Sequence, residues 1–168
     1  ETHTLGGAGG AAGTGDAALM GTWWQSLAVC TPDSNGSLTV TLTANANGKV
    51  AADAVCLVEV PGEFSTPVID NHSPGYSESS TGWLAAFNNP DYSYQSGFRY
   101  HVAGSTSDAA TWSFANLSTS KHYQVLATWD NVTGMATNAP YTITGSTTST
   151  VLVNQAMGTG DAALHGNW

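Results

Sequence analysis

Apolar and polar residues alternate with a period of two along most of the chain, as in β-strands that bury one face. The clearest case is residues 37–43, where Leu38, Val40 and Leu42 alternate with hydroxyl residues. Similar runs recur at residues 22–29, 50–60, 68–70, 98–102, 110–114, 122–129, 139–144 and 149–155. No helical period longer than a turn or two is present. The pattern predicts an all-β protein, an antiparallel two-sheet sandwich of jelly-roll type.

Turn-forming residues divide these runs. Asn45–Gly48 is expected to turn the chain back from residues 37–43 into residues 50–60, since Asn-Gly tolerates positive φ at little cost. The Pro- and Gly-containing stretch Pro61–Pro67 is expected to be a linker. The polar and aromatic stretch from Asn71 to Gln95 is predicted to be a long loop.

One segment occurs twice. Residues 13–23 return as residues 158–168 with nine of eleven positions identical, and such a repeat favours a repeat architecture. We interpret residues 13–60 as the last part of one β-sandwich repeat and 68–168 as the first part of the next, joined by linker 61–67 and preceded by a flexible Gly/Ala-rich arm, 1–12. A local duplication inside one self-sufficient domain is the alternative. The candidate assembly motif comprises Asp16, Leu19, Trp23, Asp161, Leu164 and Trp168.

The charge balance limits the classes of molecule that this protein is expected to bind. Three Lys or Arg residues stand against twelve Asp or Glu, a net charge of −9 at neutral pH. This balance repels phosphate backbones and anionic lipid, so we expect no nucleic-acid partner. No apolar run is long enough for membrane insertion. The first residues lack the basic start of a signal peptide, so an exported protein would be present here in its mature form.

Cysteine and asparagine residues suggest covalent modifications. Cys30 and Cys56 are consistent with a disulfide in an oxidising compartment, because a hairpin between them could bring them together; two buried thiols are the alternative. Asn-x-Ser/Thr triplets are candidate glycosylation sites wherever the host modifies such sites. They begin at Asn35, Asn71, Asn116 and Asn131.

Catalytic and metal-binding motifs are absent from the sequence. No His-Glu-x-x-His, Cys-x-x-Cys or Gly-x-Ser-x-Gly pattern occurs, so we predict no catalytic residue, no metal ligand and no cofactor. Asp16 and Asp161 are expected to organise loops through hydrogen bonds to backbone, with a structural calcium as the alternative. Trp83, Tyr92 and Tyr94 are candidates for carbohydrate stacking, with packing inside the loop as the alternative.

Several motifs carry a family resemblance. They are Gly75–Glu78, Phe98–Tyr100, Ser107–Phe114, Tyr123–Trp129, Ala136–Ile143 and Val153–Gln155. With these motifs the sequence resembles the golvesin C-terminal-like domain, also described as the carbohydrate-binding-like domain of a xanthan lyase. The segments that follow in that family here come first, as Trp24–Leu27, Gly36–Val40 and Ala46–Val55, so the order is permuted. Met135 stands where the family pattern has a basic residue, which bears on any ligand contact there.

Repeat and permutation together favour an exported structural subunit. A sandwich made of residues 67–168 alone would lack three strands, and residues 22–60 of a neighbouring copy would supply them. Repeated head to tail, such a contact builds a filament of copies of this chain. Two other arrangements are open: the chain's own residues 22–60 fold back, or the chain is a window of a longer tandem array. The alternative function is a non-catalytic, extracellular carbohydrate-binding module with a polysaccharide partner.

Overall fold

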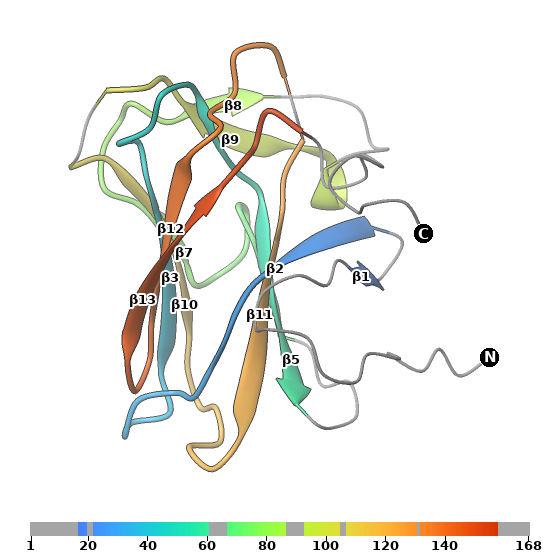
Figure 1. The fold of residues 1–168 in the computed structure, drawn as a ribbon, viewed down its shortest axis with the longest axis vertical. Helices are drawn as coiled ribbons and strands as arrows, with labels where there is room; N and C mark the ends of the chain where they lie inside the picture. Colours follow the sequence, from blue (N-terminus) through green and yellow to red (C-terminus); the bar gives the residue numbers. More distant parts are fainter. Residues whose placement is uncertain are drawn as a thin grey trace.

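The computed structural model describes residues 17–19, 22–60, 67–86, 93–104, 107–130 and 132–157; the side chains of residues 17–19, 22, 23 and 96 lie outside this description. Within these residues the chain is built from β-strands and one short 3-10 turn, η1 (Tyr94–Ser96) (Figure 1). The strands are β1 (Ala17–Leu19), β2 (Thr22–Cys30), β3 (Leu38–Thr43), β4 (Val50–Ala52), β5 (Ala54–Val60), β6 (Val68–Asp70), β7 (Tyr76–Glu78), β8 (Leu84–Ala86), β9 (Phe98–His101), β10 (Ala109–Phe114), β11 (His122–Thr128), β12 (Ala139–Thr144) and β13 (Thr148–Val153).

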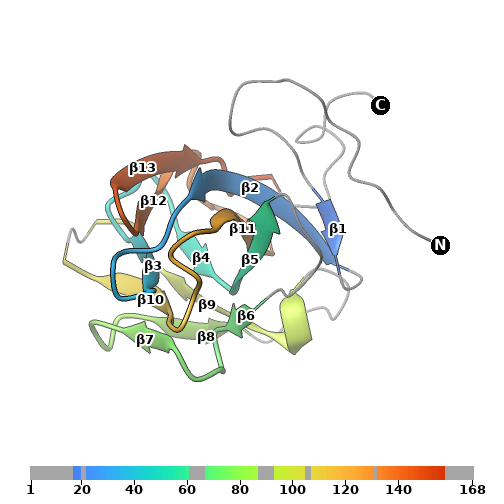
Figure 2. The ribbon, with the colours of Figure 1, turned by 90° about the horizontal axis from the view of Figure 1, so that it is seen from below.

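Two five-stranded sheets face each other. One has the order β1-β2-β11-β5-β6 and the other the order β13-β12-β3-β10-β7 (Figure 2). A three-stranded sheet, β4-β9-β8, lies at one end of the sandwich (Figure 1). Each pair of neighbouring strands runs antiparallel. The predicted all-β antiparallel sandwich is therefore confirmed, and the third sheet is an addition to it.

The main core lies between the two large sheets. Leu38, Val40 and Leu42 of β3 are fully buried there, as their alternation predicted. The ring of Trp112 on β10 stacks on the ring of Tyr141 on β12, with centroids 6.3 Å apart, and β3 lies between these two strands in the sheet. Burial of such large apolar side chains is the main stabilising term of the fold.

Threonine hydroxyls form a row across the outer face of the sheet β13-β12-β3-β10-β7, which we call the β3 sheet. Thr41 lies opposite Thr111 of β10 on one side and Thr142 of β12 on the other, and Thr142 lies opposite Thr150 of β13. The hydroxyl oxygens of Thr142 and Thr150 are 2.9 Å apart. Cross-strand hydroxyl pairs of this kind stabilise a solvent-facing sheet without charge.

Two expectations about connections are wrong. The stretch predicted as a loop from Asn71 to Gln95 contains β7 and β8, each three residues long. Asn45–Gly48 does not close a hairpin, because β3 pairs with β10 and β12 whereas β4 pairs with β9 in another sheet. At Gly48 the chain passes so close to neighbouring backbone that a Cβ would lie 2.8 Å from the carbonyl oxygen of Gly134.

In this structure the chain's own residues 22–60 complete the sandwich. β3 lies between β10 and β12, and β5 lies between β11 and β6. β2 pairs with β11, and β4 with β9. The described residues of the two predicted partial repeats, 13–60 and 68–168, are thus interleaved in space rather than side by side.

The predicted disulfide between Cys30 and Cys56 is not formed; both residues are free thiols. Cys30 lies opposite Tyr123 on one side of β11, and Cys56 lies opposite Leu126 on the other side. Two strand spacings, roughly 10 Å, therefore separate them across the sheet, and the step from Tyr123 to Leu126 separates them further along it. Their side chains also belong to different apolar clusters, with Cys30 against the main core and Cys56 in a smaller cluster with Trp24 and Leu126. A disulfide needs Cα atoms within about 7 Å.

We expect the folded protein to keep two unreactive thiols under oxidising conditions. Burial raises the pKa of Cys30 to about 11 and that of Cys56 to about 12, so neither is a thiolate at neutral pH. Thiol titration should count both cysteines in denaturant and neither in the native protein. A reductant should leave the melting temperature unchanged, whereas missing thiols in a monomeric sample would contradict this geometry.

Candidate assembly interface

The interface between residues 22–60 and the rest of the described chain is the candidate functional site. We call residues 22–60 the inserted segment and the described residues of 67–157 the frame. β3 contributes buried apolar side chains to this interface. Its backbone is hydrogen-bonded to frame strands on both sides. A frame without the inserted segment would expose the apolar core faces of β10, β11 and β12 to water, which costs free energy, and would leave open sheet edges.

A buried glutamine joins the two parts. Gln155 of the frame is fully buried. Its Oε1 accepts the backbone N–H of Ala51 at 2.8 Å, and its Nε2 donates to the backbone oxygen of Ala51 at 2.8 Å. Nε2 also donates to the hydroxyl of Tyr141 at 3.0 Å. The glutamine thus mimics a strand partner for one residue of β4, and fixes the inserted segment in register.

A second set of polar contacts surrounds the connection between β3 and β4. The Asn47 side chain donates from Nδ2 to Thr137 Oγ1 at 2.7 Å and accepts the Thr137 N–H at 2.9 Å. Lys49 Nζ donates to the backbone oxygen of Thr133 at 3.1 Å. From the other side, Lys121 of the frame pairs with Glu59 at 2.5 Å. Two of the three cations in the sequence therefore bridge the inserted segment and the frame.

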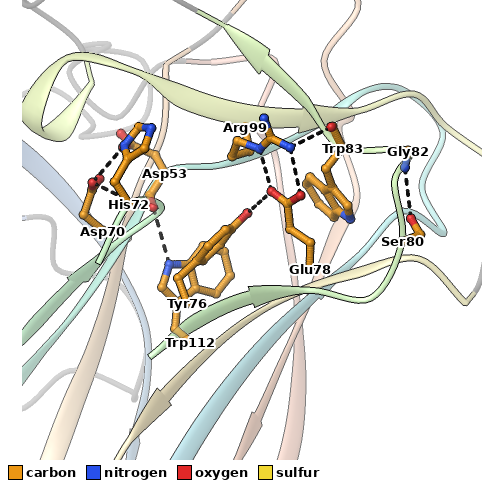
Figure 3. Close-up of polar contacts among 10 residues, drawn as sticks. All are labelled: Asp53, Asp70, His72, Tyr76, Glu78, Ser80, Gly82, Trp83, Arg99 and Trp112. Atoms are coloured by element: carbon orange, nitrogen blue, oxygen red, sulfur yellow. Dashed lines mark hydrogen bonds and ion pairs between the residues drawn. The ribbon is translucent and has the colours of Figure 1, made fainter. Parts of the chain in front are cut away.

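Asp53 is a buried carboxylic acid of the inserted segment, between β4 and β5. Its Oδ2 accepts the Tyr94 N–H at 3.0 Å. Its backbone oxygen accepts Trp112 Nε1 at 3.4 Å (Figure 3). Oδ1 has no hydrogen-bond partner within the described part of the chain. Burial raises the pKa of Asp53 well above its ordinary value, and the charges of Asp70 and Asp130 raise it further. The frame therefore surrounds this carboxyl with like charge rather than with a cation.

Asp70 is affected in the same direction. Burial raises its pKa, although hydrogen bonds from His72 oppose the shift. His72 Nδ1 lies 3.3 Å from Asp70 Oδ2, and the His72 side chain is largely exposed (Figure 3). Two neighbouring carboxyl groups with raised pKa values make this corner of the interface sensitive to pH.

An arginine clamp holds the frame together beside this corner. Arg99 of β9 donates from Nε and Nη2 to the two carboxylate oxygens of Glu78 in β7, at 2.6 and 2.8 Å (Figure 3). Nη2 also donates to the backbone oxygen of Trp83 at 2.7 Å, and the Tyr76 hydroxyl donates to Glu78 at 3.0 Å. Burial of Glu78 opposes ionisation, but the hydrogen bonds from Arg99 and Tyr76 lower its pKa. The clamp joins the three-stranded sheet to the edge of a five-stranded sheet.

The candidate carbohydrate contacts do not form one platform. Trp83 is only 2% exposed, and its ring packs edge-on against His101, with centroids 5.4 Å apart. Its expected role as a surface for stacking is therefore not supported. Tyr94 is half-buried against Trp24, with centroids 5.6 Å apart. Tyr92 lies outside the described residues.

The candidate glycosylation sites differ in exposure. Asn35 and Asn116 are exposed. Asn71 is buried, with its side-chain nitrogen placed to donate to Asp70 Oδ1 at 2.8 Å and to the Gly97 oxygen at 3.0 Å. A glycan cannot be attached there without breaking these contacts, so this candidate is corrected. Asn131 lies outside the described residues.

The repeated segment is described only in part. The backbones of Leu19 and Trp23 belong to the β1–β2 pair, with Leu19 opposite Thr22 and Ala18 opposite Trp23. The other four candidate assembly residues, Asp16, Asp161, Leu164 and Trp168, lie outside the described residues, and so do both candidate calcium ligands. In the described ranges no group of three or more His, Cys, Asp or Glu side chains could hold a metal ion. The described residues form no helix with the length and apolarity to cross a bilayer.

Replacing Gln155 should weaken the join between inserted segment and frame. In Gln155→Met the volume is kept, but the Ala51 N–H loses its buried acceptor, and the Ala51 carbonyl keeps only the longer hydrogen bond from the Tyr141 hydroxyl, at 3.4 Å. Each such loss costs about 1–3 kcal/mol, so we expect the free energy of unfolding to fall by about 2–5 kcal/mol in urea titrations. Gln124→Met is the matched control, because within the described residues the half-buried side chain of Gln124 makes one hydrogen bond, to Ser26 Oγ. Its loss should be under about 1.5 kcal/mol. Equal losses would show that Gln155 has no special role.

Replacing Asp53 should change how stability depends on pH. A carboxyl with a raised pKa keeps its proton in the folded state, so the stability that it contributes is complete below about pH 3.9 and is lost as pH rises through the folded pKa. Asp53→Asn should remove this loss, and raise the free energy of unfolding more at about pH 8 than at about pH 4. Urea titrations at both pH values test this against the half-buried control Asp33→Asn. An equal effect of Asp53→Asn at both pH values would refute it.

Comparisons with known proteins identify a family. A family model described as the Golvesin C-terminal domain matches residues 67–168, more than half of the chain. The inserted segment lies outside the matched stretch. No curated protein and no solved structure matches the chain. A match to this family suggests a secreted, carbohydrate-binding-like domain. The resemblance read from the motifs is thereby confirmed, and the chain belongs to the Golvesin C-terminal domain family.

Proposed function

We propose that this domain is an extracellular structural subunit that assembles head to tail into a filament by exchanging its inserted segment between copies. One observation carries the proposal. The inserted segment supplies β3, the middle strand of one large sheet, and β5, an interior strand of the other. A frame is therefore incomplete without an inserted segment, whichever copy provides it.

Exchange preserves the contacts of the interface. The inserted segment of a neighbouring copy carries the same Ala51 for Gln155 and the same Asn47 for Thr137. Only the connection through residues 61–66 has to run differently. The closed form, in which the inserted segment stays in its own chain, and the exchanged form therefore differ little in contact energy. Higher protein concentration favours the exchanged form. Because each copy gives to one neighbour and receives from another, the contact does not close and a filament results.

The sequence repeat supports this reading. Residues 158–168 repeat nine of the eleven residues of 13–23, and the first copy contains β1 and the start of β2. The repeated segment therefore occurs in the sequence both before and after the frame. The secreted character of the family supports an extracellular location.

Carbohydrate binding is the second candidate, favoured by the family to which the chain belongs. Tyr94 and Tyr100 are half-buried aromatic side chains of the frame, and Lys49 Nζ lies 5.9 Å from the centroid of the Tyr100 ring. Partly exposed aromatic rings can stack on sugars. This candidate predicts a monomer whose inserted segment stays in its own chain.

Cysteine cross-links between inserted segment and frame test the exchange. Thr39 of β3 lies opposite Ser113 of β10, so Thr39→Cys and Ser113→Cys can be joined by oxidation in a chain carrying Cys30→Ala and Cys56→Ala. When chains with one cysteine each are mixed at high concentration and oxidised, we expect disulfide-linked dimers, and from the double variant a ladder of covalent polymers. Non-reducing gels read both.

Ser77→Cys with Thr111→Cys is the matched control. Ser77 lies opposite Thr111, and both belong to the frame, so this pair should cross-link within one chain whether or not exchange occurs. If Thr39→Cys and Ser113→Cys join only within one chain at every concentration, the exchange proposal fails and the carbohydrate-binding candidate takes its place.

A further inference from the structure

The edge strands of the described sheets are unequal in length. Five edge strands, β1, β4, β6, β7 and β8, have three residues each. β13, at the edge of the β3 sheet, has six. A short edge strand discourages pairing with another chain, whereas a long one presents a row of free backbone donors and acceptors.

β13 also lacks the other features that protect an edge. It contains no Pro and no charged residue. Its pairing with β12 runs from Thr144 opposite Thr148 to Ala139 opposite Val153 without a register shift. By contrast, β2 continues past β1 without a further partner strand among the described residues, and its pairing with β11 is interrupted by an irregularity. Such a bulge twists an edge away from a partner.

The surface of β13 is exposed and neutral. Residues 148–150 and Leu152 are exposed, and Leu152, at 65%, exceeds the other exposed large hydrophobic side chains in the described residues. Figure 1 shows β13 lying along the outside of the sandwich next to β12. The sequence has no charged residue and no histidine between Asp130 and Asp161, although the whole chain carries a net charge of −9.

We propose that β13 is a lateral association site at which a second copy of this chain adds its own β13 in antiparallel orientation. The two β3 sheets then form one continuous sheet across a two-fold axis, and the contact is isologous because both copies use the same strand. A second copy is the occupant because two chains of high negative charge can approach most closely where neither carries charge. This association is independent of head-to-tail exchange. Where both occur, it joins neighbouring filaments side by side.

The test begins with a chain that cannot exchange. In the background with Cys30→Ala and Cys56→Ala, the disulfide between Thr39→Cys and Ser113→Cys locks the inserted segment to its own frame. We expect the locked, monomeric chain to dimerise with increasing concentration in sedimentation velocity experiments. Leu152→Lys should weaken this dimer by about ten-fold or more, since it puts a lysine on each of the two pairing edges, where charge discourages strand addition.

Leu84→Lys is the matched control. Leu84 is 47% exposed and lies on β8, an edge of three residues, so the change adds the same charge and should leave dimerisation unchanged. A locked chain that stays monomeric, or equal effects of the two lysines, would overturn the proposal. In the first case the edge would be left to a strand of another protein.

The cross-link expected at the contact gives a second readout. In a locked chain, Thr150→Cys adds one free thiol on β13, whereas Ser77→Cys adds one on β7 at the opposite edge of the same sheet. Oxidation should give covalent dimers of the first variant and not of the second. Dimers of the Ser77→Cys variant alone would place the contact at the wrong edge and refute the inference.

Discussion

Every interior strand of this sandwich needs a hydrogen-bonded neighbour on both sides, and the inserted segment supplies several of those strands. β3 is the middle strand of one large sheet, and its apolar side chains fill the core between the sheets. A buried backbone group without a partner costs about as much as a lost hydrogen bond. We therefore expect neither the frame nor the inserted segment to fold alone, because each depends on the other for its core and its backbone pairing.

Polar contacts fix the register of the inserted segment against the frame. The apolar face of β3 would tolerate a shift of two residues, because such a shift keeps the same side chains inside. Gln155 and Asn47 do not tolerate it, since each binds particular backbone or side-chain atoms of the opposite part. Asp53 acts in the opposite sense. Its buried carboxyl faces two further carboxylates, so part of the interface is held less tightly at neutral pH than its apolar contacts alone would allow.

The net negative charge of the chain, −9, bears on both kinds of proposed contact. Strand exchange and edge pairing each bring copies of one acidic protein together, and like charge opposes this. The outer face and the edge of the β3 sheet carry rows of threonine and no charge on β12 or β13. Exchange places contacts along a line of copies, whereas edge pairing places them across it. The two contacts use different strands, and therefore add to each other rather than compete.

Much of the fold was readable from the sequence, because a strand's pattern is local. Alternation at residues 37–43 predicted which side chains of β3 are buried, and the motifs from Gly75 to Gln155 indicated the family. What the pattern could not specify was which strands are neighbours. Only the tertiary structure decided that β11 separates Cys30 from Cys56, and that Trp83 lies inside. The role of Gln155 depends on residues more than a hundred positions away. Such contacts arise when distant strands pack, and no local period in the sequence records them.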